Sequence, residues 1–115
     1  MPKTAKEYGL IVTEEWDERY DLKKATRAAV EYLKASYSRF GDWALTCAAY
    51  NCGEAGVKKQ MSNQECKDYW SLNINSETSR YVYRILAYKI LMENPQQYGF
   101  YVRLRDCHQP LQYET

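Results

Sequence analysis

Hydrophobic residues recur along the chain at helical spacing, in segments separated by residues that begin or end helices. Pro2 and Gly9 bound a short predicted helix over residues 2–8, which a turn over residues 13–20 follows. A longer helix is predicted between Asp21, a good N-cap, and Gly41. Its apolar positions follow three- and four-residue steps: Leu22, Ala25, Ala29, Leu33 and Tyr37.

The next helix is predicted to be buried. Asp42 can cap it, and nearly every residue from Trp43 to Ala49 is apolar or small, as in a helix surrounded by other elements. Cys47 is therefore expected to be a small core residue. Gly53 and Gly56 are expected to interrupt the chain after this helix.

Three helices are predicted in the remainder. A short one is expected from Val57 to Met61, and the capping-box pattern of Ser62 and Glu65 predicts another that ends near residue 70. Ser76 is expected to cap the last long helix, which Pro95 ends. Residues 98–115 are polar and lack a clear period, so we predict one all-α domain over residues 1–97 and an irregular tail over 98–115.

Composition narrows the function classes. The chain has 115 residues with 16 basic and 15 acidic ones and a net charge of +1, which gives no strong attraction to nucleic acid or to anionic membranes. We expect no membrane-spanning segment and no signal peptide, because no apolar run has the required length or context. Four cysteines without a C-x-x-C pair and the single His108 exclude a zinc site, and no cofactor is expected.

Aromatic residues and one polar pair suggest chemistry. The chain has 12 tyrosines and three tryptophans. These residues suit both the solvent-facing edges of a hydrophobic core and sugar-binding grooves. Tyr50 and Asn51 end the predicted buried helix, where polar groups need hydrogen-bond partners. Such a pair can orient a catalytic carboxylic acid or a sugar hydroxyl. The alternative is structural: Asn51 caps the helix and Tyr50 packs, and spacing alone favours this alternative.

The surroundings of this pair add a family resemblance. The stretch LTCAAYNCGEAGVKK resembles the A-Y-N-x-G-x-x-x-V motif of lytic transglycosylases with the soluble-lytic-transglycosylase fold, which is lysozyme-like and helical. Three further segments resemble the family in the same order: MPKTAKEYGL, the stretch from WDERYD to FGDW, and SETSRYVYRILAYKIL. Together they span about residues 1–94, and they are most similar to the membrane-bound type D enzymes.

The resemblance implies cleavage of the β-1,4 bond between N-acetylmuramic acid and N-acetylglucosamine, with a 1,6-anhydro product. One glutamic acid acts first as acid and then as base, so its pKa must be raised by apolar surroundings. In the family this glutamate lies in an E-S motif upstream of the segment that begins here at Met1. The chain's early glutamates are expected to be solvated and ordinary in acidity: Glu7, Glu14, Glu15 and Glu18. We therefore predict that this chain alone is inactive.

The resemblance also implies which residues meet the substrate, the glycan strands of peptidoglycan. Tyr50 and Asn51 match the family's pair that contacts the acid and the substrate, and Glu77 and Tyr81 are expected near the glycan groove. Glu77 has an alternative role, because a carboxylate in a helix's first turn stabilises the helix dipole. The parent protein is expected in the cell envelope or periplasm.

Two other functions remain open. The chain is alternatively a non-catalytic glycan-binding module that keeps the groove without the acid. It is otherwise a helical protein-interaction module. Without a glutamate-bearing helix, apolar surface is expected on residues 43–51 and 78–91, and a homodimer is one way to cover it.

Overall fold

The computed structural model describes residues 2–107, so Met1, His108 and the rest of the predicted tail lie outside the described residues. The chain divides into two compact units, one up to Val82 and one from Tyr83 onward.

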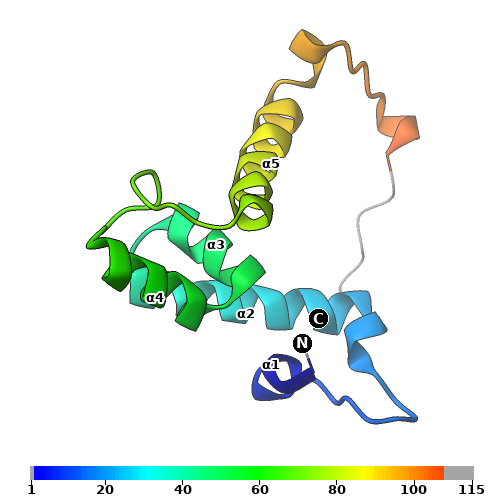
Figure 1. Ribbon diagram of the computed structural model, residues 1–115. Coiled ribbons are helices and arrows are strands. Elements are labelled where there is room, and N and C mark those ends of the chain that lie inside the picture. The colour runs from blue at the N-terminus through cyan, green and yellow to red at the C-terminus, as the bar shows by residue number, and fades with distance from the viewer. Residues whose placement is uncertain (1, 108–115) are drawn as a thin grey trace. The chain divides into compact units, whose positions relative to one another are not determined.

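The described residues form helices and short 3-10 turns without a β-strand, which confirms the all-α class (Figure 1). The only β-type pairing among them is an isolated bridge between Val12 and Asp17. The first unit holds α1 (Pro2–Glu7), η1 (Glu18–Tyr20), α2 (Leu22–Phe40), α3 (Trp43–Cys52), α4 (Glu54–Gln64) and the start of α5 (Ser76–Glu93). The second unit holds the rest of α5, η2 (Pro95–Tyr98) and η3 (Leu104–Asp106).

The predicted boundaries of α2 and α3 are confirmed by their capping geometry. Asp21 Oδ1 accepts a hydrogen bond from Lys24 N at 2.9 Å at the start of α2. Gly41 ends α2 in the left-handed region, with φ of 65°. Asp42 Oδ1 then accepts from Leu45 N at 2.7 Å and begins α3. Each cap acts within its own neighbourhood, which is why sequence pattern located all three.

Two predictions about α4 are wrong. Gly56 lies inside α4 instead of interrupting the chain, because a helix interior tolerates one glycine at a cost of about 1 kcal/mol. Ser62 lies in the last turn of α4, so it does not start a helix ending near residue 70. Glu65 ends α4 with a left-handed φ of 54°, and Cys66 N donates to Met61 O at 3.1 Å. A capping box would need the Glu65 N–H for the Ser62 side chain, whereas this N–H donates to the Met61 and Ser62 carbonyls.

The cap of α5 lies one residue earlier than predicted. Asn75 Oδ1 accepts from Thr78 N at 2.9 Å, so Asn75 caps the helix instead of Ser76. Both residue types are good N-caps, and contacts outside the helix decide between them.

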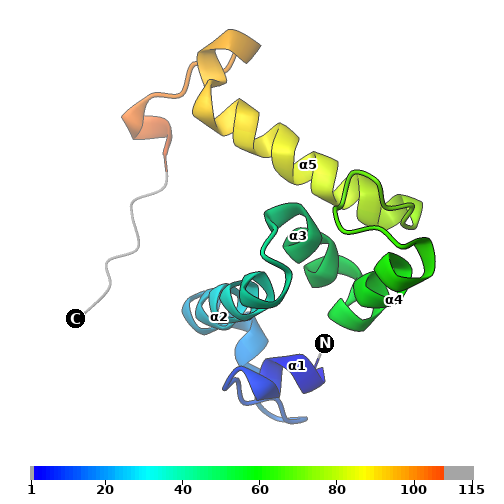
Figure 2. The same ribbon diagram turned by 90° about the vertical axis from the view of Figure 1, so that its left-hand side faces the viewer.

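The main core of the first unit is built around α3. Leu45, Ala48 and Ala49 are almost completely buried, which confirms the prediction of a buried helix, and Val57 of α4 joins them. Cys47 packs against this cluster as predicted. The helix α3 contacts α2 and α4, and it lies between them in the view of Figure 2. Its small side chains allow these neighbours to approach closely.

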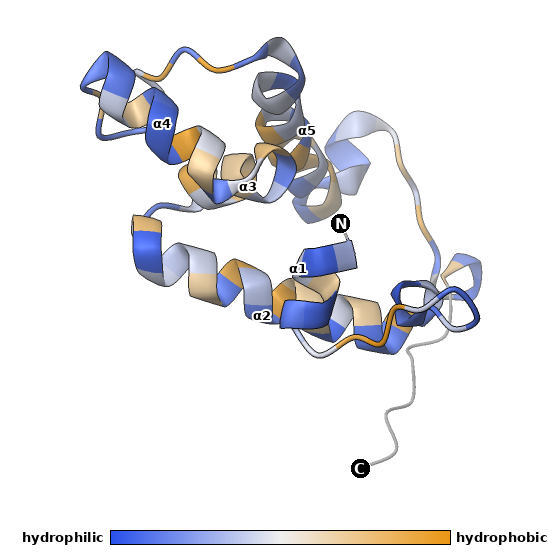
Figure 3. Cartoon of the chain, turned by 60° about the horizontal axis from the view of Figure 1, so that its bottom comes forward, coloured by the Kyte–Doolittle hydropathy of each residue, from blue (hydrophilic) through white to orange (hydrophobic). Residues whose placement is uncertain are grey.

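The helix α2 alternates between hydrophilic and hydrophobic positions, as expected of a helix with one buried face (Figure 3). Its Ala28 forms a second, smaller cluster with Leu10 and Val12 from the segment after α1. No helix in the described part of the chain combines the length and the apolar character that crossing a bilayer requires.

The prediction that Glu18 is solvated is wrong. Glu18 is only 6% exposed; its Oε2 accepts from Ile11 N at 2.8 Å, and its Oε1 pairs with Lys24. The Ile11 N–H, followed by the Lys24 ammonium, lowers the pKa of the Glu18 carboxyl. Glu18 therefore fastens the segment after α1 to the start of α2.

Candidate functional site

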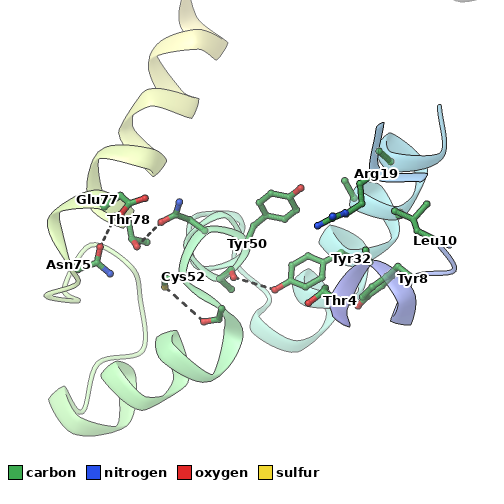
Figure 4. A pocket seen from close by; sticks show the side chains of 17 residues that line it. Thr4, Tyr8, Leu10, Arg19, Tyr32, Tyr50, Cys52, Asn75, Glu77 and Thr78 are labelled. Atoms are coloured by element: carbon green, nitrogen blue, oxygen red, sulfur yellow. Dashed lines mark hydrogen bonds between the residues drawn. The ribbon is translucent and has the colours of Figure 1, made fainter. Parts of the chain in front are cut away.

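The first unit contains an open groove with a volume of about 810 Å³ (Figure 4). Its lining comes from the α1 region, η1, the inner face of α2, the C-terminal end of α3, and the residues around the start of α5. The face of α2 is formed by small side chains, Ala25, Ala28 and Ala29, which leave room beside the helix.

Three tyrosines form a row along this groove, in the order Tyr50, Tyr32 and Tyr8 (Figure 4). The ring of Tyr32 meets the other two edge-to-face, with both centroid distances at 5.5 Å. Its hydroxyl donates to the Ala49 carbonyl at 3.2 Å and so joins α2 to α3. Burial raises the pKa of the Tyr32 phenol above its ordinary value. The row therefore offers apolar rings with polar edges.

Tyr50 and Asn51 both line the groove at the end of α3. Tyr50 keeps 45% of its surface exposed, so the groove side of its ring is accessible. Asn51 Oδ1 accepts from Thr78 Oγ1 of α5 at 2.8 Å. The side chain of Asn51 thus contacts α5, and the C-cap of α3 is Gly53.

Glu77 and Tyr81 lie in the first two turns of α5, and of these two residues only Glu77 lines the groove. Glu77 lines the groove from the first turn, where its exposed carboxylate also complements the helix dipole. Tyr81 is not among the lining residues; it is half-buried, and burial raises its pKa, with Tyr50 and Cys47 as neighbouring ionisable groups. Three of the four predicted site residues therefore meet at one groove.

Comparison with known proteins decides the family. Residues 1–73 match the family described as Transglycosylase SLT domain. This chain belongs to that family. The membrane-bound lytic murein transglycosylase D of Escherichia coli strain K12 is 38% identical over 104 residues, which cover 86% of this chain and 23% of that protein. The protein of the same name from E. coli O6:H1 strain CFT073 has the same identity and coverage.

The family match confirms the resemblance seen in the sequence. The SLT chain described here spans 23% of the length of these curated relatives.

The lining residues that sequence patterns missed include Tyr8, Arg19, Tyr32 and Thr78. A signal for Tyr32 was present, because Ala25, Ala28 and Ala29 precede it on one helical face. Arg19 reaches the groove from η1 while its guanidinium pairs with Asp17. Tyr8 and Arg19 lie outside the long amphipathic helices, so no apolar stripe indicates the direction of their side chains.

Among the described residues, the carboxylic acids with a shifted pKa lie outside the groove. The acids whose pKa is shifted, Asp17, Glu18, Asp68 and Asp106, all shift downward because each accepts hydrogen bonds. In the described part of the chain, Glu77 is the one carboxylic acid that lines the groove, and it is exposed. Within residues 2–107, no cluster of three histidine, cysteine or acidic residues is arranged to hold a metal ion.

Proposed function

We propose that this chain forms one wall of the glycan-binding groove of a peptidoglycan lytic transglycosylase. The parent protein would act on the MurNAc–GlcNAc bond in the cell envelope or periplasm. The observation that carries the proposal is the meeting of Tyr50, Asn51 and Glu77 at one groove of an SLT chain. The relatives named murein transglycosylases support the substrate class.

The chemistry of the groove suits an oligosaccharide. The row of Tyr8, Tyr32 and Tyr50 offers ring surface against the apolar C–H faces of sugar rings, and the phenol groups offer hydrogen bonds. Asn51 and Glu77 add an amide and a carboxylate that can bind sugar hydroxyls. A long polar polymer with apolar faces fits a groove that is open and mixed in character.

We also propose that the 115-residue chain alone does not cleave glycan. A general acid in this reaction needs a raised pKa, which burial among apolar groups supplies. Glu77 is exposed in the first turn of α5, so it lacks this apolar burial.

Binding to purified peptidoglycan sacculi in a co-sedimentation assay tests the proposed groove. The wild-type chain is expected to sediment with sacculi, and Tyr50→Ala is expected to lose most of that binding. Tyr20→Ala is the matched control, because Tyr20 is 88% exposed and does not line the groove. Equal binding by the two variants would overturn the assignment of the groove.

Mass spectrometry of muropeptides tests the proposed inactivity. Sacculi incubated with the chain are expected to yield no 1,6-anhydro products. Anhydro products from the wild-type chain, lost in Glu77→Gln, would overturn the proposal and assign the acid to Glu77.

A second candidate is association through α5, as a homodimer or with a protein partner. Its support is the set of exposed apolar side chains on the part of α5 in the second unit: Leu86, Tyr88, Ile90 and Met92. Sedimentation velocity tests this candidate; a clean monomer across a wide concentration range would contradict the homodimer.

A further inference from the structure

Thr78 lies in the first turn of α5 and connects that helix to the end of α3. It is 1% exposed, and its backbone N–H is held by the Asn75 side chain at 2.9 Å. Its hydroxyl donates to Asn51 Oδ1 at 2.8 Å, across 27 residues of sequence. Figure 4 shows this hydrogen bond beside the groove, with Thr78 between Asn75 and the end of α3.

The hydrogen bond determines which end of the Asn51 amide remains available. The amide has an acceptor end, Oδ1, and a donor end, the Nδ2 NH₂ group. The acceptor end is engaged by Thr78, whereas Nδ2 has no hydrogen-bond partner among residues 2–107. In that range, Ser36 Oγ is the only side-chain nitrogen or oxygen that is both buried and without a partner. Because Nδ2 has no partner and is not that atom, it keeps some exposure to solvent. The free donors therefore belong to a residue that lines the groove.

We propose that Thr78 is a positioning residue that locks Asn51 as a hydrogen-bond donor to the groove. A locked donor selects a ligand with a pure acceptor at that point, and the carbonyl of a sugar N-acetyl group has this chemistry. A solvated sugar hydroxyl is both donor and acceptor and adapts to either amide orientation, so a sugar with only hydroxyl groups depends less on the lock. The Thr78 hydroxyl is buried and has no other acceptor for its proton among the described residues, so it favours the orientation in which Asn51 Oδ1 accepts. The ligand part of this proposal rests on the proposed function.

Three substitutions separate the lock from the donor. Thr78→Val has nearly the same shape but no hydroxyl, so it frees the amide to reverse. Thr78→Ser keeps the hydroxyl and is the matched control. Asn51→Asp keeps the acceptor for Thr78 and removes the NH₂ donors. Far-UV circular dichroism and melting of each variant verify that it folds.

Calorimetric titration with chitotetraose and cellotetraose measures the consequence for binding. Losing one hydrogen bond to the ligand lowers affinity by about tenfold, so Asn51→Asp and Thr78→Val are each expected to weaken chitotetraose binding by up to about tenfold. Thr78→Ser is expected to remain within about twofold of wild type, and cellotetraose is expected to respond less to all three variants. Because Thr78 acts through Asn51, the double variant is expected to bind no more weakly than Asn51→Asp. Additive losses, or full chitotetraose affinity in Thr78→Val, would overturn the proposal.

The side-chain NH₂ resonances of Asn51 in ¹⁵N-labelled chain test the lock without ligand. Wild type and Thr78→Ser are expected to show one solvent-exposed NH₂ pair, and Thr78→Val is expected to shift or broaden it. An NH₂ group hydrogen-bonded to Thr78 in wild type would overturn the lock. If wild type binds no glycan, the proposed function and the N-acetyl selectivity fail, while these resonances still decide the lock.

Discussion

Gly53 is the position where the structure predicts the sharpest effect of a single methyl group. It ends α3, begins α4, and has φ of 88° and ψ of 143°. Its N–H donates to Ala49 O at 2.8 Å, and its own carbonyl accepts from Val57 N at 3.2 Å. The sequence-based expectation that a glycine permits the sharp exit after Asn51 is confirmed by this positive φ.

The cost of Gly53→Ala comes from the backbone alone. A Cβ at residue 53 would meet no atom within 4 Å, so steric clash contributes nothing. This φ,ψ region is populated almost only by glycine, and holding another residue there costs about 1–3 kcal/mol. Gly56→Ala is the matched control, because Gly56 has helical geometry and its Cβ would lie 3.9 Å from Cys52 Sγ, an ordinary contact. Alanine there is expected to stabilise the helix by about 0.5–1 kcal/mol.

Urea unfolding followed by tryptophan fluorescence measures both variants. Trp16, Trp43 and Trp70 all lie in the first unit, so the signal reports on the part of the chain that holds both glycines. Gly53→Ala is expected to lower the unfolding midpoint at unchanged m-value, and the two variants are expected to differ by about 1.5–4 kcal/mol. A Gly53→Ala chain as stable as wild type, or equal losses in both variants, would refute the reasoning.

Three further predictions concern stability. Ser36→Ala is expected to be neutral or to stabilise by up to about 1 kcal/mol in thermal melting, because Ser36 Oγ is buried without a partner in the described residues; a clear loss would contradict this. Tyr32→Phe is expected to cost only about 0.5–1.5 kcal/mol in urea unfolding, because Ala49 O keeps its bond from Gly53 N; a larger loss would show that the hydroxyl does more. Glu18 has a lowered pKa in the folded chain, so its stabilisation is present above the unfolded pKa and is lost as pH falls through the folded pKa. The difference in melting temperature between wild type and Glu18→Gln should therefore be largest near neutral pH and shrink on acidification; a constant difference would contradict this.

Helix boundaries set by neighbouring residues were predictable from sequence, and those set by distant contacts were not. The side chains of Asp21 and Asp42 each accept a hydrogen bond from the backbone N–H three residues further along the chain. At the start of α5, Asn75 and Ser76 are both suitable capping residues, and Asn75 is the one that caps the helix. Thr78, whose N–H Asn75 caps, also contacts Asn51 of α3 through its hydroxyl. The sequence pattern contains no information on that contact.

The candidate site shows the same division. Tyr50 and Asn51 stand out because a polar pair ends an apolar helix, a local pattern. The position of Tyr8 depends on how the segment after α1 packs against α2, which local pattern does not determine. Glu18 was misjudged for the same reason: its neighbours in sequence are charged, whereas its neighbours in space include the Ile11 N–H.

A titration of ¹⁵N-labelled chain with chitotetraose, followed residue by residue, tests the central claim most directly. Our account predicts saturable shifts at Tyr50, Asn51 and Glu77, with smaller shifts at the half-buried Tyr81. Trp43, which is 55% exposed and outside the groove, should not shift. No saturable shift at any residue, or shifts centred on Trp43 with the groove unchanged, would contradict the claim that this groove binds glycan.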